Sequence, residues 1–98
     1  MNVRQLRKWM GAQNLTAKFR EARQGQRMIG RGGLVANYTI EYPALSRRDT
    51  GDESFYSKAE LFKSVSELSK LGVPITSITV SLVDNESYTE YTIAKWSV

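Results

Sequence analysis

Apolar residues near the start of the chain recur at helical spacing. Within residues 2–12, Val3, Leu6 and Met10 fall on one side of a helix, and the opposite side is basic. Asn2 precedes the first of these positions, where a short polar side chain can accept a hydrogen bond from a free backbone N–H. The pattern predicts a first helix within residues 2–12 that ends at Gly11.

A second helix is predicted over residues 57–71. Ser57 and Glu60 match the S-x-x-E capping box, and leucine, phenylalanine and valine follow at helical intervals. Gly72 stands where a helix commonly ends in a left-handed residue, and Pro74 prevents continuation.

Four other segments alternate between apolar and polar residues and predict strands. Residues 15–23 place Leu15, Ala17 and Phe19 on one side, and residues 34–42 alternate in the same way. The other two predicted strands are 75–83 and 88–96, and the polar stretch 44–56 is interpreted as a turn-rich loop.

These elements predict a single α+β domain over residues 1–98. The order is α-β-β-α-β-β, with a four-stranded antiparallel sheet and two helices on one face. The strand at 88–96 can lie at an edge of the sheet, where it could pair with a second copy in a homodimer.

Charge is distributed unevenly. Residues 1–48 hold ten Lys and Arg against two acids, whereas residues 49–98 hold four Lys against eight acids. A strongly basic half indicates an anionic partner. The candidate nucleic-acid-binding residues are the ten cations of the first half: Arg4, Arg7, Lys8, Lys18, Arg20, Arg23, Arg27, Arg31, Arg47 and Arg48.

The segment 24–33, QGQRMIGRGG, joins two predicted strands and has two interpretations. Its glycines allow backbone N–H groups to approach phosphate, with Arg27 and Arg31 supplying charge. Alternatively, the glycines serve only the positive φ angles of a hairpin turn. The segment contains no complete phosphate-binding motif, so both interpretations stay open.

The residue inventory excludes most catalytic chemistries. The chain has no histidine and no cysteine, which removes the commonest general base, nucleophilic thiols and thiolate metal sites. The triplet Asp49-Thr50-Gly51 matches that of aspartic proteases, but charged neighbours replace the apolar strand that such an aspartate follows. We therefore expect no enzyme, no cofactor and no metal site.

Two hypotheses of function follow. The first is a non-catalytic module that binds nucleic acid or another polyanion through its arginine-rich half. The alternative is an inhibitor or adaptor of the phage or mobile-element type, comparable to anti-CRISPR proteins only in size, that docks on a nucleic-acid-handling protein complex. The basic N-terminus lacks the apolar core of a signal peptide, and no apolar run is long enough for a membrane span, so we expect a cytoplasmic protein.

Overall fold

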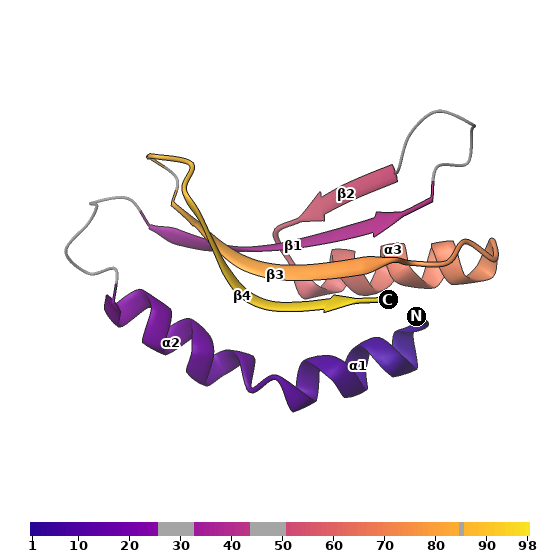
Figure 1. Ribbon diagram of the computed structural model, residues 1–98, viewed down its shortest axis with the longest axis horizontal. Helices are drawn as coiled ribbons and strands as arrows, with labels where there is room; N and C mark the ends of the chain where they lie inside the picture. The colour runs from indigo at the N-terminus through magenta and orange to yellow at the C-terminus, as the bar shows by residue number, and fades with distance from the viewer. Residues whose placement is uncertain (26–32, 44–50, 85) are drawn as a thin grey trace.

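The computed structural model describes residues 1–25, 33–43, 51–84 and 86–98, which form an α+β fold with an open antiparallel sheet (Figure 1). Three helices and four strands are found in these residues. Their order is α1 (Val3–Ala12), α2 (Leu15–Gly25), β1 (Leu34–Tyr42), β2 (Gly51–Phe55), α3 (Lys58–Lys70), β3 (Ser77–Asp84) and β4 (Glu90–Ser97).

The sheet has the strand order β2-β1-β3-β4, and every neighbouring pair is antiparallel. The central strands β1 and β3 pair with Ile40 opposite Ile78 and Tyr38 opposite Val80, and all four side chains are buried. They therefore form one apolar face. The predicted four-stranded antiparallel sheet is confirmed.

The segment predicted as the first strand is instead the helix α2. Leu15 and Phe19 are buried and Ala22 is half-buried, and this i, i+4, i+7 spacing is the apolar stripe of a helix. The alternation that suggested a strand ends after Phe19, and the following Arg20–Gln24 are mostly good helix formers. The prediction of two helices is therefore wrong, because the described residues hold three.

The fourth strand comes from the segment interpreted as a loop. Gly51–Phe55 pairs with β1 as β2, with Phe55 opposite Tyr38 and Glu53 opposite Ile40. Its residues are half-buried or exposed, because β2 is short and lies at the edge of the sheet. Its sequence, GDESF, therefore lacks the apolar alternation on which strand prediction depends.

In the strand β4, the side-chain positions that face the core shift by one residue part way along. Thr92 pairs with Ser81 and Ala94 pairs with Val80, so Ile93 is an extra residue that forms a β-bulge. This shift brings Tyr91, opposite Leu82, and Trp96, opposite Ile78, to the same face of the sheet although their positions differ in parity.

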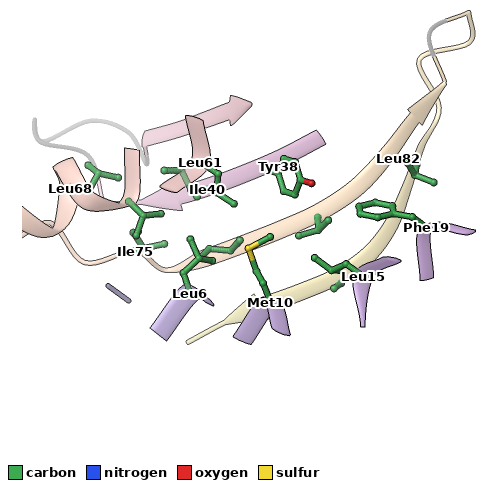
Figure 2. Close-up of a cluster of buried hydrophobic side chains, with 14 residues drawn as sticks. Leu6, Met10, Leu15, Phe19, Tyr38, Ile40, Leu61, Leu68, Ile75 and Leu82 are labelled. Atoms are coloured by element: carbon green, nitrogen blue, oxygen red, sulfur yellow. The ribbon is translucent and has the colours of Figure 1, made fainter. Parts of the chain in front are cut away.

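One hydrophobic core lies between the sheet and the helices. Figure 2 shows Leu6, Met10, Leu15 and Phe19 directed from α1 and α2 toward the strands, and α3 adds further apolar side chains that include Leu61. In Figure 1, α1 and α2 follow each other along the side of the sheet. The exposed sides of these two helices are consequently left to polar and basic residues.

Local capping explains where α1 and α3 begin and where α3 ends. The predicted end of the first helix at Gly11 is wrong, because α1 continues to Ala12 and its C-cap is Gln13. The Asn2 side chain accepts a hydrogen bond from the Gln5 backbone N–H, and Ser57 accepts one from the Glu60 N–H. At the end of α3, the Val73 N–H donates to the Leu68 carbonyl at 2.9 Å. Gly72 has a φ of +72°, which completes a Schellman motif.

Gly72, just after α3, and Gly11, inside α1, predict opposite effects of substitution by alanine. Gly72→Ala forces a Cβ into the left-handed region and should lower the free energy of unfolding by about 1 kcal/mol. Gly11→Ala lies inside α1, where a Cβ meets nothing within 4 Å, and should raise the free energy of unfolding by roughly 0.5–1 kcal/mol. Urea denaturation of both variants measures the difference, and changes of the same sign would contradict the assignment of these helix ends.

Candidate nucleic-acid interface

Six of the ten predicted binding residues lie on α1 and α2. They are Arg4, Arg7 and Lys8 on α1 and Lys18, Arg20 and Arg23 on α2. The other four, Arg27, Arg31, Arg47 and Arg48, lie outside the described residues, as does most of the glycine-arginine segment 24–33.

Arg7 belongs to α1, and its side chain reaches Phe62 of α3. Its guanidinium carbon is 5.4 Å from the centroid of the Phe62 ring, which is a cation–π distance. Arg7, Lys58 and Phe62 line one hollow of about 380 Å³, and Thr16 of α2 also belongs to it. The ring of Phe62 therefore restricts the orientation of Arg7 while leaving the side chain exposed.

The second hollow follows α2. It has a volume of about 440 Å³ and is lined by Thr16, Arg20, Arg23 and Gln24. Their i, i+4, i+7, i+8 spacing places these residues on one flank of the helix. Because Thr16 lines both hollows, the two adjoin. We call the set Arg7, Thr16, Arg20, Arg23 and Lys58 the basic strip.

The two hollows of the basic strip are lined by cations and neutral residues. Among the described residues that line its two hollows there is no aspartate and no glutamate. Glu21, the one acid of α2, lies about 100° around the helix from Arg20 and lines neither hollow. The described lining of the strip is therefore positive, which attracts anions.

The side chain of Arg23 is also held by its surroundings. Its guanidinium carbon is 5.7 Å from the centroid of the Phe19 ring, on the preceding turn of α2. Burial raises the pKa of the Tyr38 hydroxyl above its ordinary value, and the positive charge of Arg23 opposes this rise. Arg23 thus lies at the boundary between the core and the exposed flank.

The other predicted residues of these helices lie outside the basic strip. Lys18 is half-buried, and its ammonium donates a hydrogen bond to the Gln13 side chain at 3.3 Å. Lys8 lines a different hollow on the far flank of α1. Arg4 is exposed on α1 but lines neither hollow of the basic strip.

Sequence reasoning missed Lys58. It is the first residue of α3 and follows the cap Ser57, at the end of the helix where partial positive charge accumulates. An acid is the usual residue there, so a lysine in the first turn was an available signal of an anionic partner. It lies in the acidic half of the sequence, which hid it from an argument based on overall charge.

Acids gather elsewhere on the molecule. Glu53, Glu60 and Glu67 line a hollow of about 410 Å³ between β2 and α3 together with Lys63, and we call it the acidic hollow. The Ser64 hydroxyl donates to the Glu53 carboxylate at 2.6 Å and fixes one of the three. Asp49 of the protease-like triplet is outside the described residues.

Comparisons with known proteins add no relative. A scan against models of protein families, a search of curated proteins and a search of solved structures each return no match for this chain. In the part of the chain that the structure describes, none of the helices has both the length and the apolar character needed to cross a membrane.

The position of Arg23 beside the core predicts how Tyr38 titrates. Because the pKa of buried Tyr38 is higher in the folded chain than in the unfolded one, its contribution to stability is complete below about pH 10. That contribution is lost as the pH rises through the folded pKa. Arg23→Gln removes an attraction for the ionised hydroxyl and should move the Tyr38 titration to still higher pH.

Ultraviolet titration of the tyrosines measures this effect, and Tyr38→Phe identifies the signal. Lys18→Gln is the matched control, because it removes one charge from the same helix on the flank bonded to Gln13. An unchanged Tyr38 midpoint in Arg23→Gln would contradict the placement of Arg23.

Proposed function

We propose that the chain is a non-catalytic protein that binds the phosphate backbone of nucleic acid through the basic strip. The observation that carries the proposal is the pair of adjoining hollows in which Arg7, Lys58, Arg20 and Arg23 meet without a lining acid. Such a surface attracts a polyanion and releases its condensed counterions.

The chemistry of the side chains favours phosphate. Guanidinium groups present planar, forked donors that match two phosphate oxygens, and three of the four cations are arginines. Arg7 and Arg23 are each held over an aromatic ring, which lowers the entropy lost when they bind. Thr16 and Gln24 add neutral hydrogen-bond donors between the charges.

The residue types available to the chain favour binding of a ligand over catalysis. A hydrolytic site needs a positioned base or nucleophile, and neither histidine nor cysteine occurs in the chain. Contacts of this kind set affinity and orientation but do not distinguish sequences, because phosphates are the same at every base pair. The proposal therefore includes strong salt dependence and weak sequence preference.

Removal of two cations from the strip should weaken binding more than removal of two elsewhere. Arg20→Gln/Arg23→Gln is compared with Lys63→Gln/Lys95→Gln, which lowers net charge equally at the acidic hollow and on β4. We expect the first pair to lower affinity for an oligonucleotide roughly tenfold or more in fluorescence anisotropy. Equal losses in both pairs would show attraction by net charge alone.

The dependence of the binding constant on salt concentration, measured in the same titration, gives the number of phosphates that the protein neutralises. Four neutralised phosphates give a slope of log K against log salt of roughly −3 on a single strand and about −3.6 on duplex DNA. Loss of Arg20 and Arg23 should reduce the slope by about 2. An unchanged slope in this variant would place the bound phosphates elsewhere.

The acidic hollow supports a second candidate function. Glu53, Glu60 and Glu67 present negative charge in a concave site, in the way that phosphates are presented to a nucleic-acid-handling protein. We propose as the alternative that the chain docks as an inhibitor or adaptor on such a protein complex. Here the acids, and not the basic strip, carry the contact.

Variants that each remove two charges of one sign separate the two candidates. Glu60→Gln/Glu67→Gln leaves the basic strip intact, so it should preserve oligonucleotide binding if the first proposal is correct. The second candidate instead expects a protein captured from a nuclease-treated lysate to be lost with this variant and retained with Arg20→Gln/Arg23→Gln. Retention with both variants would remove the acidic hollow as a docking site.

A further inference from the structure

A larger hollow lies on the flank of α1 that faces away from the basic strip. It has a volume of about 550 Å³, within the roughly 300–1,000 Å³ range of small-molecule sites. Trp9 of α1 and Trp96 of β4 both line it, and Ile75, which is 2% exposed, belongs to its apolar wall. We call it the tryptophan hollow.

The two indole rings remain partly open to solvent. Trp9 and Trp96 are half-buried, although both pack against the core. Tryptophan usually places its N–H against a partner and its ring against apolar groups when it is fully enclosed. A concave apolar site with two accessible indoles offers flat rings on which another flat ring can stack.

Cations connect this hollow to the basic strip around the outside of α1. With about 100° per residue, Arg4 is about 60° beyond Arg7, Lys8 is a further 40° on, and Trp9 follows about 100° beyond Lys8. Arg4, Arg7 and Lys8 are exposed, and Lys8 itself lines the tryptophan hollow. No aspartate or glutamate is among the described residues lining the hollow.

We propose that the tryptophan hollow receives an unpaired base of single-stranded nucleic acid. The inference rests on the proposed function and deepens it, because it assigns the strand type. The phosphates of the strand cross α1 over Arg7, Arg4 and Lys8, and one base enters between Trp9 and Trp96. Base–aromatic stacking together with a cationic track is the general basis of single-strand binding.

A base fits these observations better than the apolar side chain of a protein partner. An apolar side chain would fill the hollow but would gain nothing from the ammonium of Lys8 at its wall or from the cations that lead to it. A nucleotide combines a flat ring with an adjacent negative charge, and the hollow combines indoles with an adjacent positive charge. A duplex holds its bases in the stack and cannot insert one without unpairing it.

Intrinsic fluorescence reports directly on this hollow. The chain contains two tryptophans, and both line it. We would titrate the protein with three polyanions, namely oligothymidylate, a DNA duplex of equal length and inorganic polyphosphate, and separately with a short apolar and a short acidic peptide. Binding is measured by competition against a fluorescently labelled oligonucleotide, and occupancy of the hollow is measured by tryptophan quenching. The expected result is binding of all three polyanions, quenching by oligothymidylate alone, and tighter binding of the single strand than of the duplex.

Substitutions identify the stacking contribution. Trp9→Leu keeps the site apolar but removes a ring, and should lower oligothymidylate affinity roughly 5- to 100-fold while leaving polyphosphate affinity unchanged. Trp9→Phe retains an aromatic ring and should recover most of the loss. Circular dichroism shows whether each variant is folded, and quenching of the remaining Trp96 reports the occupancy that is left.

The outcomes separate this inference from the proposed function. Binding of all three polyanions without quenching, or with equal affinity for single strand and duplex, overturns the tryptophan hollow as a base site and leaves the basic strip as a phosphate site. Quenching by an apolar or acidic peptide, and none by oligothymidylate, identifies a protein occupant and overturns it as well. Failure to bind any polyanion at low salt overturns both proposals.

Discussion

Burial on a single face of the sheet is the constraint on which the rest of the molecule depends. The central strands β1 and β3 present Ile40, Ile78, Val80 and Leu82 to one side, and these side chains are almost fully enclosed. Removing that surface from water is the main favourable term available to a chain without disulfides. The three described helices supply the cover, and each contributes one apolar stripe to the common core. The charged residues of α1 and α2 are therefore confined to the outside of the helical layer, where a basic surface results.

The sequence contains enough information for the elements whose ends are set locally. Asn2, Ser57 and Gly72 mark hydrogen bonds that span three to five residues, so the start of α1 and both ends of α3 follow from short motifs. The segment of α2 satisfies both periods over its first five residues, since Leu15, Ala17 and Phe19 alternate while Leu15 and Phe19 also share a helix face. The residues after Phe19 favour the helix by their propensity, and the packing of Leu15 and Phe19 against the sheet decides between the two structures. The strand β2 is defined by pairing with β1, and a polar edge strand leaves no periodic trace in its own residues.

The candidate site was predictable in its charge but not in its arrangement. An excess of arginine in the first half indicated an anionic partner, and Arg7, Arg20 and Arg23 belong to the resulting strip. A strand at residues 15–23 would have grouped Lys18 with Arg20, whereas the helix turns them about 200° apart. Lys58 joins the strip only because α3 returns to α1, a contact between residues about fifty positions apart that no local pattern encodes. In a similar way, Trp96 of β4 and Trp9 of α1 are far apart in the sequence but line the same hollow.

The bulge at Ile93 has a consequence for association between copies of this chain. β4 is an outermost strand of the described sheet, and the outer edge of such a strand offers a template to an extended segment. An added strand that keeps regular spacing can match β4 either before Ile93 or after it, because the extra residue breaks the repeat between the two parts. Strand addition at this edge is thereby limited to a few residues, which suits a short, reversible contact and discourages the growth of continuous intermolecular sheets.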